Sequence, residues 1–167
     1  RTAEAMIRIE KLIGKKIDIV VMVQGDEPMV TAEMIEKSIE PFNNIDVNIV
    51  NLMSRMETTE EFEDPNEPKV VVDTNNNALY FSREPIPSRK KGATDVPMYK
   101  QVCVIPFRRQ ALLGFNACHE TELERIESID MNRVLENGGN VKMVLIEGNP
   151  ISVDTESDLL RVSKKLL

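Results

Sequence analysis

The sequence predicts a mixed α/β fold, in which helices cover an open, mostly parallel twisted sheet that carries an inserted β-hairpin. Residues 17–23 form an almost unbroken apolar run rich in β-branched side chains, which is typical of a strand buried on both faces of a parallel sheet. The residues that follow at once are Gln24, Gly25, Asp26, Glu27 and Pro28. Ligands of open α/β sheets bind at such a position, beyond the carboxyl end of a strand.

The start of the chain predicts a helix that leads into this strand. One face of residues 2–13 carries four apolar side chains that we expect to point into the core: Ala5, Ile9, Leu12 and Ile13. Gly14 is a natural helix stop. A helix followed by a buried strand is half of a βαβ unit, so we expect the first strand of that unit in a further N-terminal segment.

The middle of the chain continues the alternation of helix and strand. Thr31 is a suitable N-cap for a helix that ends near Pro41, and residues 47–53 are the next strand. Residues 57–68 are acidic and without periodicity, which predicts an exposed loop. Three asparagines separate two strand-like runs and tolerate the left-handed backbone of a tight turn, so we expect a hairpin over residues 69–83.

The remainder adds strands at residues 102–107 and 141–146 with helices after each. Thr121 and Glu124 fit a capping box, which predicts one helix that continues to Asn137. Three apolar side chains of the last helix are expected to point inward: Leu159, Leu160 and Val162. Residues 1–167 are enough for a single domain with a sizeable core.

Composition excludes several classes of function. The chain has 21 Lys and Arg against 28 Asp and Glu, a net charge of -7, so we expect neither nucleic-acid nor membrane binding through general electrostatics. No apolar run approaches the ~20 residues that span a bilayer, and we expect a cytoplasmic protein. Cys103 and Cys118 are expected to be reduced thiols, and His119 is the only histidine. Any metal should therefore be a hard cation with oxygen ligands.

Two aspartates stand apart from the general surface charge. Asp26 follows the first strand and Asp154 follows the last, and each precedes a helix. In a mostly parallel sheet both would lie at one edge, where they could hold Mg²⁺ and leave positions for phosphate oxygens and water. A helix cap is the alternative for Asp154, and an Asx-type turn is the alternative for Asp26. The chain has no GxxxxGK[ST] or GxGxxG phosphate loop.

Charged side chains in two other stretches have both a structural and a functional interpretation. Arg83, Arg89, Lys90 and Lys91 make a local basic patch near two prolines, which is either plain surface or a group of cations held toward an anionic ligand. Glu124 and Glu127 share one helix face, which is either a solvated stripe or part of a site.

Five motifs together resemble one enzyme family. They are VQGDEP at 23–28, ALYFSREPIP at 78–87, LERIES at 123–128, RVLENG at 133–138 and SVDTESDLLRV at 152–162. In this order and spacing they resemble the larger part of a 3-deoxy-manno-octulosonate cytidylyltransferase, or CMP-Kdo synthetase. The resemblance implies a nucleotide-diphospho-sugar transferase fold and a homodimer. It also implies Mg²⁺-dependent transfer of CMP from CTP to the anomeric hydroxyl of a 2-keto sugar acid, with release of pyrophosphate, for lipopolysaccharide or surface polysaccharide synthesis.

The resemblance also assigns residues. Asp26 and Asp154 match the family's magnesium-binding catalytic acids, and Gln24 matches a substrate contact. Arg83 matches an arginine lining the sugar-acid pocket, and the acidic positions on the facing helix are matched by Glu124 and Glu127. The family's RLPGK-type loop, which grips the CTP phosphates, has no counterpart, so this segment alone is expected to be inactive.

Two departures from the family pattern bear on the sugar. Gln101, which we expect to contact substrate, stands where the family commonly has histidine, and Met131 replaces a glutamine. With these two polar positions lost, the sugar acid is expected to be Kdo or a relative, such as another eight- or nine-carbon 2-keto acid or an amino variant of Kdo. A cytidylyltransferase for sialic-acid-like sugars and a non-catalytic α/β binding or regulatory domain remain the alternatives.

Overall fold

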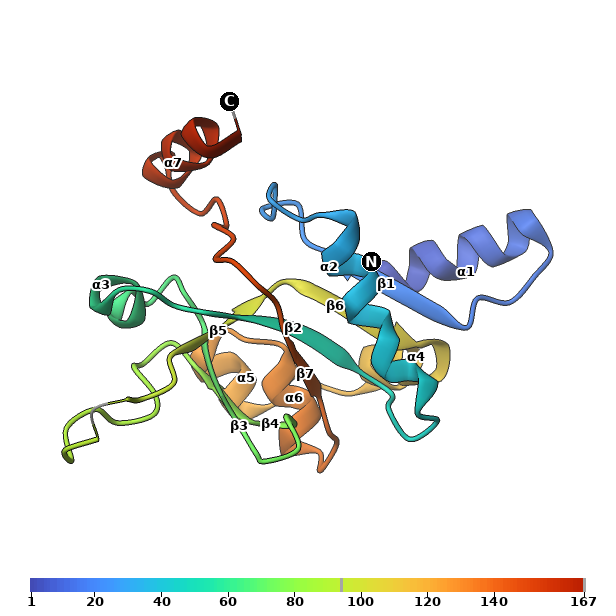
Figure 1. Ribbon diagram of the computed structural model, residues 1–167. Coiled ribbons are helices and arrows are strands. Elements are labelled where there is room, and N and C mark those ends of the chain that lie inside the picture. The colour runs from blue at the N-terminus through green and yellow to red at the C-terminus, as the bar shows by residue number, and fades with distance from the viewer. Residues whose placement is uncertain (94, 167) are drawn as a thin grey trace.

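The computed structural model describes residues 1–93 and 95–166. The helices are α1 (Thr2–Ile13), α2 (Ala32–Ile39), the 3-10 turn η1 (Glu40–Asn43), α3 (Thr59–Glu63), α4 (Arg109–Ala117), α5 (Glu122–Glu127), α6 (Met131–Glu136) and α7 (Glu156–Leu166). The strands are β1 (Ile19–Val23), β2 (Val50–Arg55), β3 (Lys69–Val72), β4 (Ala78–Ser82), β5 (Tyr99–Val102), β6 (Val104–Arg108) and β7 (Lys142–Leu145). Figure 1 shows an open arrangement, with α5 and α6 beside the larger sheet and α7 standing away from it. No helix in the described part of the chain is both long and apolar enough to cross a membrane.

Two sheets share one continuous stretch of chain. A five-stranded sheet has the order β4-β3-β5-β2-β7, and β1 and β6 form a second, two-stranded sheet. Cys103 alone separates β5 from β6, so the chain passes from one sheet into the other at this residue. The two sheets also touch through a bridge between Ile49 and Phe107.

The predicted α/β class and open sheet are confirmed, but the directions of the strands need correction. Within residues 1–93 and 95–166 only β2 and β7 pair in parallel, whereas the β1–β6, β2–β5, β3–β4 and β3–β5 pairs are antiparallel. The reason is the β5–β6 stretch, which runs opposite to both β1 and β2. Apolar composition alone does not reveal this direction, because a buried antiparallel strand reads like a parallel one.

The inserted hairpin forms as predicted, from β3 and β4. Asp73 organises its turn, because one carboxylate oxygen accepts hydrogen bonds from the backbone N–H groups of Asn75 (2.8 Å) and Asn77 (2.7 Å). Asn76 has φ 57°, a left-handed conformation that asparagine tolerates better than most residues.

Helix α1 ends as predicted, with Gly14 at φ 67°, but its buried face was predicted wrongly. Ala5, Ile9, Leu12 and Ile13 are all exposed, Leu12 to 85%. The buried residues of this helix are Ala3, Met6 and Glu10. A polar anchor sets this orientation, because Glu10 is only 5% exposed and its carboxylate accepts hydrogen bonds from the Arg109 side chain and the Ile17 N–H.

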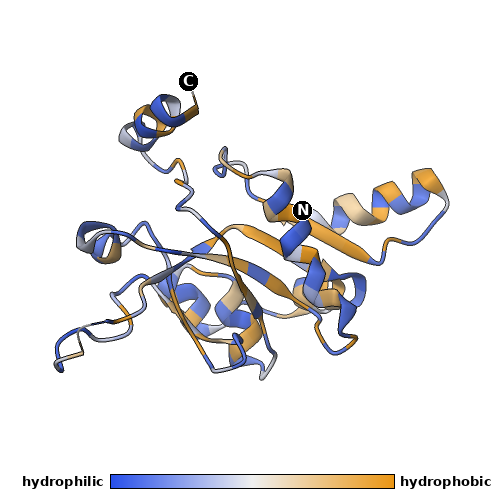
Figure 2. Ribbon diagram, in the orientation of Figure 1, coloured by the Kyte–Doolittle hydropathy of each residue, from blue (hydrophilic) through white to orange (hydrophobic). Residues whose placement is uncertain are grey.

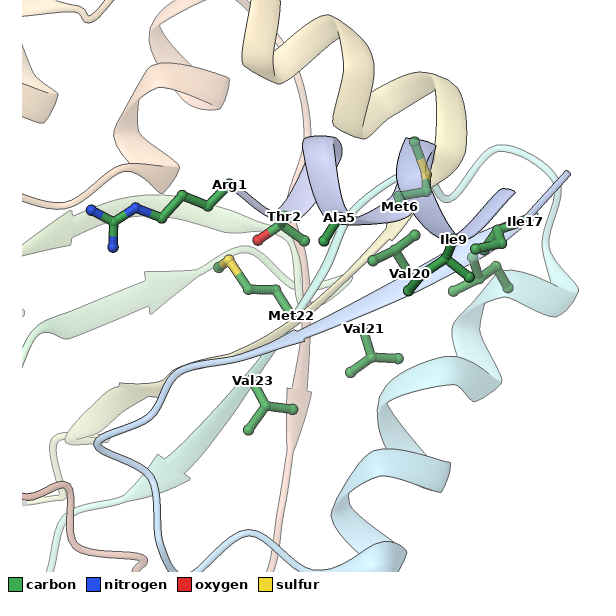
Figure 3. Close-up of a pocket in the computed structure, with 11 residues that line it drawn as sticks. Arg1, Thr2, Ala5, Met6, Ile9, Ile17, Val20, Val21, Met22 and Val23 are labelled. Carbon is green, nitrogen blue, oxygen red and sulfur yellow. The ribbon is translucent and has the colours of Figure 1, made fainter. Parts of the chain in front are cut away.

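The exposed side of α1 and the free edge of β1 border an apolar groove of about 520 Å³. Figure 3 shows Met6 and Ile9 of α1 above Val20 of β1, and Figure 2 shows that β1 is hydrophobic along its length. β1 pairs with β6 along one edge, and no other strand of the described residues pairs with it. β1 is therefore partly exposed and not buried on both faces as the sequence predicts, and its backbone has one edge open to a further strand.

The acidic residues 57–68 are not the exposed loop that the sequence predicts. They contain α3, whose Phe62 is 2% exposed. Lys100 of β5 is also buried, and its ammonium group pairs with Glu61 (2.8 Å) and Glu67 (3.1 Å). The Lys100 ammonium group thus holds this segment against the sheet, and such long-range pairing is invisible in local sequence.

Two further helix predictions need correction. The helix expected up to Asn137 is broken into α5 and α6 at Ser128, which has φ 54°. In α7 only Val162 of the three expected inward residues is buried, because the helix stands off the sheet and leaves Leu159 (53%) and Leu160 (61%) exposed.

Replacing Glu10 by Gln should flatten the acid dependence of stability. Hydrogen bonds from Arg109 and from the Ile17 N–H lower the pKa of Glu10 to about 2, from an ordinary value of 4.5. The folded pKa lies below the unfolded one, so this stabilisation is complete above pH 4.5 and is lost as the pH falls toward 2. Urea unfolding at a series of pH values should show a smaller loss for Glu10→Gln than for the wild type. Glu4→Gln, which removes an exposed pair with Arg8, should keep the wild-type slope.

Candidate functional site

The polar loop after β1 is folded back onto the junction between β5 and β6. The Gln24 N–H donates to the Cys103 carbonyl (3.1 Å), and the Glu27 N–H donates to the Gln24 carbonyl (3.3 Å). These bonds continue the β1–β6 ladder for one residue and then turn the chain. Asp26 and Glu27 are thereby placed beside the point where the chain changes sheets.

The segment before α7 meets this loop. The Val153 N–H donates to the Asp26 carbonyl (2.8 Å), so residue 153 lies against residue 26 although 127 positions separate them in the chain. The structure therefore brings Asp26 and Asp154 into one neighbourhood, as the sequence predicts, but through two loops rather than through adjacent parallel strands. Asp154 is not the residue that caps α7. Thr155 and Asp158 cap this helix by exchanging hydrogen bonds.

The two aspartates suit a hard cation. Burial raises the pKa of Asp154, and the nearby negative charge of Asp26 raises it further. The Oδ1 atom of Asp26 is buried and has no hydrogen-bond partner among the described residues. Oxygen atoms that are short of positive partners fit Mg²⁺, which typically takes one or two carboxylates and fills its other positions with water and phosphate. Residues 1–93 and 95–166 contain no group of three or more His, Cys, Asp or Glu that could hold a metal, so a cation here would depend on this pair.

Glu27 is a third carboxylate of this neighbourhood, and the sequence did not single it out as a site residue. It is 5% exposed, and its Oε1 atom accepts hydrogen bonds from the Cys103 N–H (2.8 Å) and the Ser152 hydroxyl (3.0 Å). Burial raises the pKa of Glu27 in spite of these two bonds. Its position next to Asp26 in the QGDEP loop was the available signal.

Cys103 and Asp130 also lie in the neighbourhood of Asp26, Glu27 and Asp154. Burial raises the pKa of the Cys103 thiol, and the charges of Glu27, Asp26, Asp130 and Asp154 raise it further. Burial also raises the pKa of Asp130, which lies at the start of α6 just after the break at Ser128. The sequence predicted a continuous helix through this region. That prediction gave no reason to place Asp130 near Asp26 and Asp154.

Arg83 and Glu127 form a clamp between the hairpin and α5. The Glu127 carboxylate accepts hydrogen bonds from the Tyr80 hydroxyl (2.8 Å), the Ser82 hydroxyl (2.9 Å) and the Arg83 N–H (2.7 Å). The Arg83 side chain donates in turn to the carbonyl groups of Glu127 and Pro65. Burial tends to raise the pKa of Glu127, but these hydrogen bonds lower it overall. Both side chains thus have structural partners, and their contact with substrate stays a prediction.

The other predicted substrate residues lie in different surroundings. Glu124 is buried and pairs through both carboxylate oxygens with Arg133 (2.7 and 2.5 Å), besides closing the predicted capping box. Gln101 is 6% exposed and donates to the Asn51 side chain (2.6 Å) across β5 and β2. Gln24 is half-buried at the turn after β1. Met131 is fully buried in the core, so the residue in place of the family's glutamine packs against apolar neighbours.

The basic patch behaves mostly as surface. Lys90 and Lys91 are exposed, and Arg89 donates to the Thr59 hydroxyl (3.2 Å) and stacks over the Phe62 ring at 5.6 Å. Within this patch Arg89 contacts α3, and Lys90 and Lys91 are exposed surface residues.

Comparison with protein families and with known sequences gives a consistent result. The family model for cytidylyltransferases matches residues 2–146. Similar proteins include the 3-deoxy-manno-octulosonate cytidylyltransferases of Geobacter metallireducens, with 37% identity over 99% of this chain and 67% of the relative, and of Pelobacter propionicus, with 37% identity over 89% of this chain and 62% of the relative. The enzyme of the same name from Solibacter usitatus is 38% identical over 90% of this chain and 60% of its own length. The chain thus spans 60–67% of the length of these relatives.

Solved structures confirm the predicted fold type. A CMP:2-keto-3-deoxy-manno-octonic acid synthetase in complex with CTP superposes with a TM-score of 0.85 at 26% identity, over 99% of this chain and 68% of that protein. A 4-diphosphocytidyl-2C-methyl-D-erythritol synthase from Anaerococcus prevotii has a TM-score of 0.59 at 14% identity, over 99% of this chain and 66% of that protein, which shows a shared fold alone.

Replacing Glu127 by Gln should lower the free energy of unfolding by about 2–4 kcal/mol. The amide has no negative charge and only one acceptor oxygen, whereas three donors share the two oxygens of the carboxylate. Urea denaturation measures this change. Glu122→Gln on the exposed side of α5 is the matched control and should stay near the wild type. A loss below about 0.5 kcal/mol for Glu127→Gln would contradict the clamp.

Proposed function

We propose that this chain, which belongs to the cytidylyltransferase family, forms the larger part of an enzyme that transfers CMP from CTP to the anomeric hydroxyl of a 2-keto sugar acid and releases pyrophosphate. The relatives that match 89–99% of this chain carry the name 3-deoxy-manno-octulosonate cytidylyltransferase, and the solved relative was in complex with CTP. One observation carries the proposal: the hydrogen bond from the Val153 N–H to the Asp26 carbonyl places Asp154 in the same neighbourhood as Asp26. Chain position pointed to both residues independently of the family.

The reaction joins the anomeric oxygen to the α-phosphorus of CTP while the bond from this phosphorus to the departing pyrophosphate breaks. Such transfers depend on positioning and on charge neutralisation more than on covalent chemistry by the protein. Asp26 and Asp154 would hold Mg²⁺, which when bound supplies positive charge to the phosphates and acidifies the attacking hydroxyl. A histidine base is then unnecessary. The positive charge of Arg83 acts on the same neighbourhood, where it lowers the pKa of Asp154 and partly offsets the effect of burial. We assign Arg83 to an anionic group of the substrate.

The sugar acid is Kdo or a close relative, and the reaction belongs to lipopolysaccharide or surface polysaccharide synthesis in the cytoplasm, by a homodimer. Gln101 is held by Asn51 within the sheet, and Met131 is in the core. Both side chains are engaged inside the protein, so the choice among 2-keto sugar acids rests on a comparison of substrates. Initial rates with CTP and a panel of 2-keto sugar acids, sialic acids included, separate Kdo-like from sialic-acid-like substrates.

The groove beside β1 supports the proposal that a further segment completes the nucleotide site. The relatives are longer than this chain by about a third or more of their length, and β1 has an open edge bordered by apolar side chains (Figure 3). A strand added parallel to β1 at this edge would bring its following loop to the carboxyl end of β1, next to Asp26. We assign the grip on the CTP phosphates to such a loop.

Asp26→Asn and Asp154→Asn should each lower the rate of pyrophosphate release by the complete protein at least about 100-fold, because each removes half of the charge offered to the cation. A coupled pyrophosphate assay with CTP, Mg²⁺ and sugar acid measures the rate. Asp46→Asn, at an exposed turn, serves as the control and should retain wild-type activity. Near-normal rates for both site variants would contradict the magnesium role.

Residues 1–167 alone should bind CTP weakly or not at all in the presence of Mg²⁺, since the phosphate-gripping loop that we assign to the further segment is missing. Isothermal titration calorimetry of this chain beside the complete protein tests this expectation. Micromolar binding by residues 1–167 alone would show that the proposed division of the site is wrong.

A further inference from the structure

Glu27 joins three segments that are distant in sequence. Its side chain extends from the loop after β1, and its Oε1 atom takes one hydrogen bond from the backbone at Cys103 and one from the Ser152 hydroxyl. The donors lie 76 and 125 residues away, and the Glu27 side chain is nearly excluded from solvent, with 5% of the residue exposed. One carboxylate oxygen therefore ties the loop after β1 both to the sheet junction and to the segment that carries Asp154.

This tie lies directly beside the pair of aspartates. The Val153 N–H donates to the Asp26 carbonyl, so residues 26 and 27 face residues 153 and 152 through two successive links. The segment between β7 and α7 has other anchors farther back, at Ile146, at Asn149 and at the buried Ile151, whose N–H donates to the Met29 sulfur. Near Asp154 itself, the position of the backbone depends on the links to residues 26 and 27.

The contacts also indicate that Glu27 works through its neighbours. Its Oε1 atom is engaged by two protein donors, and its Oε2 atom is buried inside the protein without a hydrogen-bond partner among the described residues. Asp26 and Asp154 are more exposed than Glu27. Glu27 thus differs from Asp26 and Asp154 in its deeper burial and in the two protein donors from which one of its carboxylate oxygens accepts hydrogen bonds.

We propose that Glu27 is a positioning residue, whose bond to Ser152 holds Asp154 at the correct place relative to Asp26 for joint cation binding. This inference rests on the proposed function. Groups that orient metal ligands typically contribute 10–100-fold to metal affinity or activity, even though they do not touch the metal. We expect an effect of this size from Glu27.

The test compares Glu27→Gln, Glu27→Ala, Ser152→Ala and the Glu27→Ala/Ser152→Ala double variant in the complete protein. Glutamine keeps an acceptor oxygen for Cys103 and Ser152, so Glu27→Gln should retain Mn²⁺ affinity within about threefold, whereas Glu27→Ala should weaken it at least about tenfold. Ser152→Ala should weaken it to an intermediate degree. The double variant should be no weaker than Glu27→Ala, because both substitutions remove the same bond.

Two further readouts separate positioning from general stability. In the metal-free protein, hydrogen exchange at the Val153 N–H should accelerate in Glu27→Ala and Ser152→Ala. Pyrophosphate release should show a lower kcat with the KM for CTP nearly unchanged. Glu10→Gln, at an equally buried glutamate remote from the site, should lower the Tm and leave Mn²⁺ affinity unchanged.

Several results would overturn the inference. If Glu27→Gln is as damaging as Glu27→Ala, the carboxylate acts by its charge and not by its bond. If Ser152→Ala leaves both Mn²⁺ affinity and Val153 exchange unchanged, the link has no positioning role, and this holds even if Glu27→Ala fails to fold. A wild-type protein without Mn²⁺ binding or pyrophosphate release would contradict the proposed function itself, whereas the two results above can arise only in an active wild type.

Discussion

The hydrogen bonds of the Cys103 backbone hold together the two sheets and the loop after β1. At this residue the chain leaves one sheet and enters another, so its carbonyl is satisfied by an extension of the β1–β6 ladder and its N–H by a side chain. Buried backbone groups need partners, and both partners come from the loop after β1: the Gln24 N–H for the carbonyl, and the Glu27 carboxylate for the N–H. The loop that carries Asp26 is thereby fixed to the junction of the two sheets.

Charge satisfaction distinguishes the structural carboxylates from those of the site. Glu10, Glu124 and Glu127 are surrounded by arginine or backbone donors, which offset the cost of burying their charges. Asp26 and Glu27 each retain a buried oxygen without a partner in the described part of the chain. Burial raises the pKa of Glu27 and of Asp154, and the positive charges of Lys100 and Arg83 respectively offset this rise only in part. Functional sites are where such incompletely satisfied groups are expected.

Local sequence predicted those features that depend on a few adjacent residues. The stop of α1 at Gly14, the Asn turn of the hairpin and the capping box at Thr121 follow from short-range backbone chemistry, and all are confirmed. The faces of helices were harder. In α1 the pattern of apolar residues was outweighed by one buried ion pair, between Glu10 and Arg109. The partner lies 99 residues away, so no local pattern contains it.

By itself the sequence determined the α/β class and the polar loop that follows the strand over residues 19–23, and it pointed to Asp26 and Asp154 as candidate site residues, because apolar runs and the residues that end them are local signals. Only the tertiary structure decided that the consecutive strands β5 and β6 belong to two different sheets, that Lys100 orders the acidic segment, and that Glu27 lies between Cys103 and Ser152. These features depend on which distant groups meet when the chain folds. Hydrogen bonds and ion pairs across such distances leave no periodic trace in a single sequence.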